Sequence, residues 1–289
     1  MNLICTVRSG QSNIKQVLKE NLSISERLFK KVKHGHIFVN GTSYLSYKPL
    51  KPNDMVTVDL DFDEECENIV PNENIHFKIL YEDEWLIIVN KPCNMPVHPS
   101  LNYYETSLSN GIKAYYIKNN IHKKIRPINR LDKDTTGIVM FAKSEYMQDN
   151  LKNYEKNYIA LCAGKLEGSG IINKNIKRKT PSIIERCVCN SNEGEVAITE
   201  YNVLSNFKID NNNYSLVKCT LKTGRTHQIR VHLSSIGHPI LGDSLYGEKT
   251  MLISRQALHA YRIKFIHPVT KEEIEIIDEI PEDMQKLID

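Results

Sequence analysis

The residues best suited to chemistry in this sequence lie in the stretch 126–143. Its first half is rich in charged and turn-forming residues, and its second half is an apolar run that predicts a buried strand. Asp132 therefore falls in a loop immediately before a strand, between the cations Arg130 and Lys133. Neighbouring cations favour the ionised carboxylate, which can act as a nucleophile but is a poor proton donor. A surface turn with ion pairs would show the same local pattern, so motifs elsewhere in the chain are needed to distinguish a nucleophile from such a turn.

Six further segments carry distinctive combinations of residues on either side of this loop. They are residues 79–92, 96–99, 156–161, 223–233, 237–243 and 258–260. Together with Arg-Leu-Asp at 130–132 and the Thr-Gly pair that precedes the apolar strand, they resemble the motifs of the RluA-type RNA pseudouridine synthases. Because several motifs occur in the same order as in the family, a chance match does not explain the resemblance.

The resemblance implies an enzyme that isomerises specific uridines to pseudouridine in structured RNA, without a cofactor or a metal. The target uridine must be flipped out of the RNA before the N-glycosidic bond can break and C5 can join the ribose. Asp132 matches the family's nucleophile. Tyr158 matches the tyrosine that stacks on the flipped base and takes the C5 proton, although a tyrosine also suits any half-buried strand. Arg230 matches the arginine that pairs with the nucleophile.

Four further residues are expected to bind the substrate. Arg130 matches the family position that reaches into the RNA near the vacated base, where a guanidinium can stack and donate hydrogen bonds. Ile229 would form part of the apolar wall around the base. A helix is predicted over 226–236, which would place Arg225 and His227 at its amino-terminal turn, a natural site for a phosphate or a carboxylate.

The sequence departs from the family pattern at two positions. Asn129 stands where the family usually has His, and Thr136 where it usually has Ser. The second change retains the hydroxyl, whereas the first removes a ring and a titratable group. Neither touches the nucleophile, so we expect activity to be retained with altered packing of the loop. Lys91 belongs to the first motif, where a scaffold role or a phosphate contact is favoured over catalysis.

Two other function classes compete with the enzyme hypothesis. The first is a non-catalytic RNA-binding factor for ribosome assembly, which Asn129 would support but which has no need of Asp132, Tyr158 and Arg230 together. The second is a glycosidase with paired carboxylates, for which the sequence offers no convincing second carboxylate. Within the enzyme hypothesis the RNA target stays open: large-subunit ribosomal RNA (23S) is favoured, and transfer RNA is the alternative.

Strand patterns dominate the chain from residue 77 onward, without strict alternation of strands and helices. Strands are predicted at 79–81, 85–90, 138–142, 157–163, 196–204, 214–221, 258–265 and 272–277, and helices near 106–117, 144–152 and 226–236. We therefore expect an α+β fold on a mixed, largely antiparallel sheet flanked by helices and loops. The resemblance implies that this sheet is bifurcated and that residues 77–289 form the catalytic domain.

Residues 1–60 predict a small separate domain. Residues 23–26 have the spacing of a capping box before a short basic helix, which a strand and an Asn-Gly turn follow. This order resembles an S4-like RNA-binding domain, in which Lys30, Lys31, Lys33 and His34 would face phosphates. Residues 61–76 hold six acidic side chains and no Lys or Arg, which predicts a linker kept extended and away from RNA by its like charges.

Composition sets the remaining expectations. The formal net charge is only +3, so affinity for RNA must come from local clusters. Candidate clusters are Lys118, Lys123, Lys124, Arg126, Arg130 and Lys133, and Lys174, Lys177, Arg178 and Lys179. The seven cysteines include no Cys-x-x-Cys pair, which favours reduced structural thiols over a metal site. No apolar run is long enough to span a bilayer and no signal peptide pattern is present, so we expect a cytoplasmic protein, by default a monomer.

Overall fold

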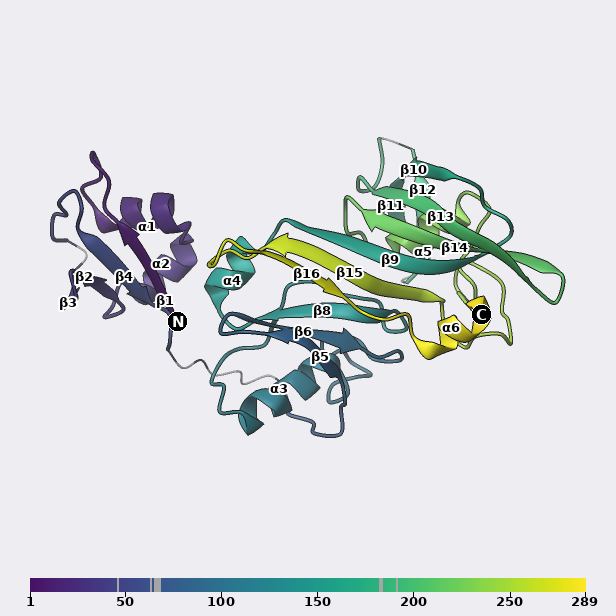
Figure 1. The fold of residues 1–289 in the computed structure, drawn as a ribbon, viewed down its shortest axis with the longest axis horizontal. Helices are drawn as coiled ribbons and strands as arrows, with labels where there is room; N and C mark the ends of the chain where they lie inside the picture. Colours follow the sequence, from purple (N-terminus) through teal and green to yellow (C-terminus); the bar gives the residue numbers. More distant parts are fainter. Residues whose placement is uncertain (46, 63, 65–68, 182–183, 191) are drawn as a thin grey trace.

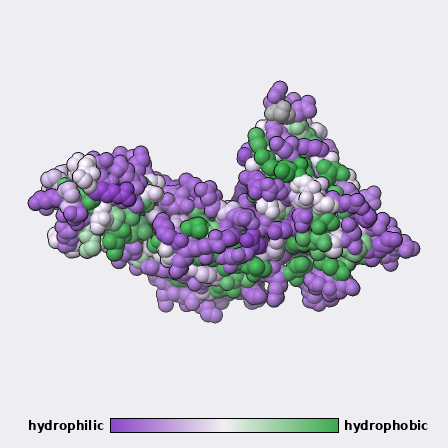
Figure 2. Space-filling model, turned by 45° about the horizontal axis from the view of Figure 1, so that its top comes forward, coloured by the Kyte–Doolittle hydropathy of each residue, from purple (hydrophilic) through white to green (hydrophobic). Residues whose placement is uncertain are grey.

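The computed structural model describes residues 1–45, 47–62, 64, 69–181, 184–190 and 192–289. These residues form a four-stranded sheet, a ten-stranded sheet and a two-stranded ribbon, with helices packed around them. Figure 1 shows the four-stranded sheet and its two helices as a separate body beside the large sheet. In the space-filling view of Figure 2, hydrophilic residues cover most of the visible face, and the surface is hollowed between the two projecting ends of the molecule.

The ten-stranded sheet forms the body of the molecule. Its strands are β5 (Lys78–Glu82), β6 (Leu86–Lys91), β7 (Arg126–Pro127), β8 (Thr136–Ala142), β9 (Tyr154–Ala163), β10 (Ser169–Asn173), β13 (Ile198–Ile209), β14 (Asn212–Leu221), β15 (Leu258–Ile266) and β16 (Glu273–Ile277). The main path runs β10-β13-β14-β9-β15-β8-β6-β5, with β16 added to β15 and β7 to β8. Among the strand pairings of the described residues, β15–β8 alone is parallel, so the predicted mixed and largely antiparallel sheet is confirmed.

The sheet divides along β15. The first residues of this strand pair with β8, at His259 with Thr136 and Ala260 with Gly137. Further along, residues 262–266 pair with β16. Gly137 is required at the junction: its φ is +114°, and a Cβ there would lie 2.3 Å from the carbonyl oxygen of Ala260. The absent side chain therefore lets β8 meet β15 directly after the loop that carries Asp132.

Helices pack against the sheet, and the apolar side chains of the first of them join those of β6 and β8. These helices are α3 (Leu108–Lys118), α4 (Glu145–Asn150), α5 (Gln228–Ser234) and α6 (Glu282–Ile288). The first three correspond to predicted helices, each with shifted ends, whereas α6 is not predicted. A small ribbon of β11 (Asn175–Arg178) and β12 (Arg186–Cys189) is also not predicted. Within it Lys177 pairs with Glu193 and Lys179 with Glu185, so these two cations of the second predicted cluster are already engaged.

The amino-terminal body consists of one sheet and two helices. Its elements are β1 (Asn2–Thr6), α1 (Ile14–Leu22), α2 (Glu26–Val32), β2 (Ile37–Val39), β3 (Thr42–Ser43) and β4 (Met55–Asp59). The predicted capping box is wrong in detail. Ser23 ends α1 in the left-handed conformation, with φ 55°, and Ser25 begins α2 by accepting a hydrogen bond from the Leu28 N–H.

Helix α2 packs against the large body through charged side chains. Lys31 and Arg27 both pair with Glu145 of α4, and Arg27 also pairs with Asp149. The Ser25 hydroxyl donates to Asp149 Oδ2 at 2.7 Å. Lys31 is therefore engaged with carboxylates and is not free to face phosphates as predicted, whereas Lys30 and His34 are exposed.

The acidic segment 61–76 also differs from the expectation where it is described. Asp61 accepts a hydrogen bond from Lys123 at 3.0 Å, and Glu64 pairs with Arg126 at 2.5 Å. Buried cations therefore fix these two acidic residues to the large body, so this part of the segment is not an extended linker held only by its like charges. Lys123 and Arg126, which were predicted to neutralise phosphates, are used in this attachment. Residues 63 and 65–68 of the segment lie outside the described residues.

Two further observations concern the described part of the chain. No helix in it is long and apolar enough to cross a membrane. No group of three or more His, Cys, Asp or Glu side chains among these residues is arranged to hold a metal ion.

Candidate active site

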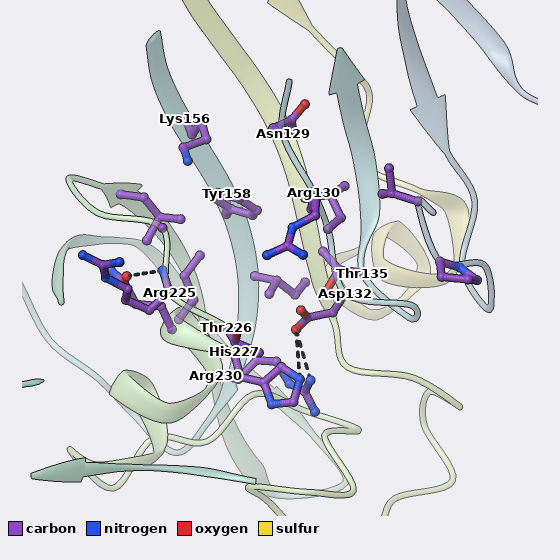
Figure 3. A pocket seen from close by; sticks show the side chains of 18 of the residues that line it. Asn129, Arg130, Asp132, Thr135, Lys156, Tyr158, Arg225, Thr226, His227 and Arg230 are labelled. Carbon is purple, nitrogen blue, oxygen red and sulfur yellow. Dashed lines mark hydrogen bonds and ion pairs between the residues drawn. The ribbon is translucent and has the colours of Figure 1, made fainter. Parts of the chain in front are cut away.

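A cavity of about 580 Å³ opens where the loop before β8, the middle of β9 and the start of α5 come together. Figure 3 shows these walls and the side chains that face one another across the cavity. All seven predicted site residues line it: Asp132, Tyr158, Arg230, Arg130, Ile229, Arg225 and His227. The volume lies within the range of about 300–1,000 Å³ that is typical of small-molecule sites.

The loop that carries Asp132 is held by a buried lysine. Lys91 has no exposed surface, and its Nζ donates to the carbonyl oxygens of Pro92, Met95 and Lys133 at 2.8–2.9 Å. The Lys133 carbonyl also accepts the Met95 N–H at 3.1 Å. Burial lowers the pKa of Lys91 to about 7. This side chain therefore acts as a scaffold beneath the loop, one of the two roles that its motif suggested.

Asn129 fixes the other side of the same loop. Its Nδ2 donates to the Ile138 carbonyl at 2.9 Å, and its Oδ1 accepts the Met140 N–H at 2.8 Å. Both bonds are buried and go to β8, so the amide joins the loop to the strand that follows it. The change from the family's usual His is accommodated here by a residue that has one donor and one acceptor end. Asn129 has no hydrogen bond to Asp132 among the described interactions.

Arg230 lies between two carboxylates. Its Nη1 donates to Asp132 Oδ2 at 3.1 Å, and its Nε and Nη2 donate to the two oxygens of Asp243 at 2.6 and 2.8 Å. Burial alone would lower the pKa of Arg230, but the hydrogen bonds and charges of Asp243 and Asp132 outweigh it and raise that pKa. The guanidinium is therefore a permanent cation whose direction is set by Asp243 and whose remaining donor faces Asp132.

His227 lines the cavity beside Asp132 and contacts Tyr246, which is not part of the lining. His227 Nδ1 lies 2.8 Å from the Tyr246 hydroxyl, and His227 Nε2 lies 3.8 Å from Asp132 Oδ2. The Tyr246 ring stands 5.1 Å from Arg230 Cζ, in a cation–π contact. Burial is the largest influence on His227 and lowers its pKa, so the imidazole is neutral at pH 7. The nucleophile candidate is thus bordered by one cation and one neutral ring.

Tyr158 projects from β9 into the cavity and is almost fully buried. Burial raises its pKa, with smaller contributions from Tyr154 and Asp132, so the phenol is neutral at pH 7. Ile229 is also buried and adds an apolar surface to the wall formed by α5. Arg130 is exposed at the mouth of the cavity, where nothing in the described chain competes for its guanidinium.

The start of the helix predicted over 226–236 is shifted in the structure. Helix α5 begins at Gln228, and His227 precedes it in the left-handed conformation with φ 58°. Arg225 lies in the loop before the helix, and its guanidinium donates to Glu195 Oε1 at 2.8 Å and to the Val196 carbonyl at 3.1 Å. Arg225 therefore borders the cavity while its charge is directed toward the segment before β13.

Sequence reasoning missed the supports of the site. Asp243 was visible as the last residue of the motif at 237–243, but no role followed from its position. Tyr246 carried no signal of its own. Gln228 fixes the loop before α5: its Oε1 accepts from the Thr223 hydroxyl and the Arg225 N–H, at 2.8 and 3.0 Å. A buried amide inside the motif at 223–233 was the only available sign of that role.

Comparison with known proteins identifies the class to which this fold and site belong. The family model described as RNA pseudouridylate synthase matches residues 85–235. The chain therefore belongs to the RNA pseudouridylate synthase family and is an enzyme with RNA as its substrate.

The relatives extend over most of the chain. It is 39% identical over 280 residues to RNA pseudouridine synthase YhcT of Bacillus subtilis (strain 168), which covers 94% of this chain and 90% of that protein. It is 33% identical over 257 residues to ribosomal large subunit pseudouridine synthase D of Zymomonas mobilis, with 82% and 79% covered. Its fold is similar to human RNA pseudouridylate synthase domain containing 1, with a TM-score of 0.59, 24% identity, and 71% of this chain and 83% of that chain covered.

Proposed function

We propose that this enzyme converts a uridine of large-subunit ribosomal RNA to pseudouridine, with Asp132 as the nucleophile. The observation that carries the proposal is the Arg230–Asp132 contact of 3.1 Å inside a cavity large enough for one nucleotide. An arginine that is already oriented by Asp243 donates to the carboxylate and fixes its position at the cavity. Ionised carboxylates are competent nucleophiles.

Different residues around the base have different roles in the proposed reaction. The N-glycosidic bond between N1 and C1′ breaks, the uracil turns, and a bond forms between C5 and C1′. The proton on C5 leaves and N1 takes up a proton, so that substrate and product are isomers; any bond formed by the nucleophile breaks again before the product leaves. Asp132 attacks either C6 of the base or C1′ of the ribose. Tyr158 stacks on the base, and because its phenol is neutral, a C5 proton received at its oxygen must be matched by release of the phenol's own proton.

The remaining site residues hold the RNA in this proposal. Ile229 supplies an apolar wall for the uracil, and Arg130, exposed at the mouth, enters the space that the flipped base leaves. His227 stays neutral, so it adds no second cation beside Asp132. Arg225 borders the cavity in an ion pair with Glu195, and because both side chains of this pair are exposed, an RNA phosphate can compete for the guanidinium.

The choice of ribosomal RNA rests on relatives. Proteins that match most of this chain are named for the ribosomal large subunit, as in Zymomonas mobilis. We further propose that residues 1–60 form an S4-like RNA-binding domain, that 61–76 connect it to a catalytic domain over 77–289, and that the enzyme acts as a monomer in the cytoplasm. Lys30 of α2 and His34, which follows the end of that helix, are exposed and available for RNA.

Tritium release tests the function and the nucleophile together. Ribosomal and transfer RNA that lack the modification are labelled with [5-³H]uracil and incubated with wild type and with Asp132→Asn. The proposal expects release from ribosomal RNA by wild type alone, with equal RNA binding by both proteins. Release only from transfer RNA would replace the proposed target. Release by Asp132→Asn near the wild-type rate would eliminate Asp132 as the nucleophile.

A further inference from the structure

Lys156 is a cation of the cavity that no part of the reaction described above uses. It lies on β9 two residues before Tyr158, and side chains two apart on a strand face the same side. Figure 3 shows Lys156 and Tyr158 following one another along β9, with Arg130 on the facing wall. The spacing along the strand is about 7 Å, so one bound nucleotide can contact both side chains.

The ammonium of Lys156 is enclosed on two sides by groups without a negative charge. Its Nζ lies 5.1 Å from the centre of the Tyr154 ring. On the other side stands Gly224, where a Cβ would lie 3.3 Å from Nζ. Burial lowers the pKa of Lys156. The half-buried charge is therefore poorly solvated, and the missing side chain of Gly224 leaves space beside it.

Lys156 lacks the carboxylate that accompanies the other enclosed cations of the cavity. Arg230 pairs with Asp132 and Asp243, and Arg225 pairs with Glu195. Within the described ranges no carboxylate lies at ion-pairing distance from Lys156. Glu155, its neighbour in sequence, is exposed and pairs with Arg262. A partly desolvated cation without a counter-charge is strongly stabilised by an anion that enters with the substrate.

RNA brings such an anion with every nucleotide. A uridine whose base stacks on Tyr158 carries a backbone phosphate on each side of its ribose. We propose that Lys156 binds one of these phosphates, so that the Tyr158 ring and the Lys156 ammonium hold the base and the backbone of the same flipped nucleotide. The inference rests on the proposed placement of the target base against Tyr158.

Three variants separate phosphate binding from a structural role. Lys156→Gln removes the charge, and Lys156→Arg retains it. Lys113→Gln is the matched control, because Lys113 is also half-buried but lies on α3, outside the cavity lining. Affinity for unmodified ribosomal and transfer RNA transcripts is measured by fluorescence anisotropy between 50 and about 300 mM salt. Single-turnover tritium release and thermal melting are followed on the same proteins.

The inference expects Lys156→Gln to raise Kd about tenfold on the RNA that is turned over, as expected for loss of one charge-assisted contact. The slope of log Kd against log salt should fall by about 0.7 to 0.9, the value for one phosphate. The rate at saturating enzyme should change by less than about threefold, since no reacting atom is touched. The melting temperature should change little, because the lost charge had no carboxylate partner and only a cation–π contact with Tyr154. Lys156→Arg and Lys113→Gln should bind as wild type.

Two results would overturn the inference. An unchanged salt slope on both RNAs means that Lys156 neutralises no phosphate, whether or not either RNA is turned over. A loss of rate at saturating enzyme with unchanged Kd means that Lys156 acts through Tyr158 and not on the backbone. Failure of the target proposal has a different signature, which is the absence of wild-type tritium release from ribosomal RNA.

Discussion

Arg230 and Asp243 form a two-point ion pair, with Nε 2.6 Å from Oδ2 and Nη2 2.8 Å from Oδ1. Asp243 is completely buried, and its Oδ1 also accepts the N–H groups of Leu245 and Tyr246. The carboxylate is thus fixed by its own backbone turn before it fixes the arginine. The one guanidinium nitrogen that Asp243 leaves over, Nη1, is the one that meets Asp132. The orientation of the proposed nucleophile is therefore set by a residue that does not touch it.

Asp243→Asn tests this dependence. The substitution leaves Arg230 with one carboxylate in place of two. The new side-chain amide has only one acceptor atom, so it cannot accept the hydrogen bonds of both Arg230 Nε and Nη2 at separate oxygens. Breaking a buried pair from one side costs about 3 kcal/mol of unfolding free energy. Because a displacement of about 1 Å at a reacting group can cost 100-fold in rate, we expect tritium release to fall by about that factor. Urea unfolding and single-turnover release measure the two effects.

Asp283→Asn is the control for that substitution. Asp283 meets Arg255 with the same two-point geometry, at 2.7 and 2.8 Å, but it is exposed and lies outside the cavity lining. We expect a loss of about 1 kcal/mol, as for pairs that water reaches, and an unchanged rate. If both variants kept the wild-type rate, Asp243 would not be needed to orient Arg230.

Lys91→Met tests the support beneath the loop of Asp132. The substitution removes the donor shared by three partly buried carbonyl groups, of which only that of Lys133 has another partner within the described part of the chain. Unpaired buried acceptors cost about 1–3 kcal/mol each, so we expect destabilisation by at least about 2 kcal/mol. Release should fall about tenfold or more as the loop shifts. Melting and single-turnover release are the measurements.

Lys143→Met separates the two consequences of Lys91→Met. Lys143 is also buried, and its Nζ binds Glu82 and the Asp83 carbonyl beyond the far end of β8. We expect a similar loss of stability without loss of rate. An equal loss of rate in both variants would mean that general destabilisation, and not the position of the loop, limits activity.

The site could be predicted from sequence where chemistry is carried by neighbours along the chain. Asp132 lies between cations and before an apolar run, and Tyr158 and Arg230 fall inside motifs, so residue type and order were sufficient to propose them. Asp243 could not be assigned a role, because its partner Arg230 is reached only when α5 has folded beside the turn that follows residue 240. Contacts between separate elements leave no periodic trace in a sequence.

The errors in the fold have local causes. The helix predicted over 226–236 begins later, because His227 adopts a left-handed conformation that apolar periodicity does not reveal. β7 has two residues and one of them is Pro127, so it is too short for any strand pattern. The acidic segment was predicted to remain free because charge content was visible but its partners were not: Lys123 and Arg126 are some 60 residues away along the chain.

Asn129→Ala tests whether the departure from the family's usual His concerns packing or chemistry. Alanine leaves the Ile138 carbonyl and the Met140 N–H buried without their side-chain partner, which should cost about 2 kcal/mol of unfolding free energy. Because Asn129 has no bond to Asp132, the rate measured well below the melting temperature should change by less than about threefold. Asn150→Ala, which removes a bond to the Tyr146 carbonyl near the surface of α4, should cost less than about 0.5 kcal/mol. A complete loss of release in Asn129→Ala would give Asn129 a part in the chemistry.

His259 on β15 contacts Thr136 on β8, and we expect it to make the fold less stable at acid pH. Its Nδ1 lies 2.9 Å from the Thr136 hydroxyl, its Nε2 lies 3.5 Å from Asp278 Oδ2, and no part of the side chain is exposed. Burial lowers the pKa of His259 to about 4, and the nearby Arg255 acts in the same direction. Burial also raises the pKa of Asp278, so this carboxyl takes up a proton more readily than usual.

The sign of the resulting pH dependence follows from His259 being harder to protonate in the folded state. Between pH 6.5 and 4, His259 binds a proton in the unfolded chain but not in the folded chain. The contribution of His259 to the free energy of unfolding is therefore complete above pH 6.5 and is lost as the pH falls. The loss from this group reaches about 1.4 kcal/mol at pH 5.5. His259→Asn removes the titration while retaining a partner for Thr136, and Asp278 remains in both proteins. Urea unfolding at pH 7.5 and 5.5 should show the extra loss in wild type only; equal losses in both proteins would assign the loss of stability at acid pH to another group.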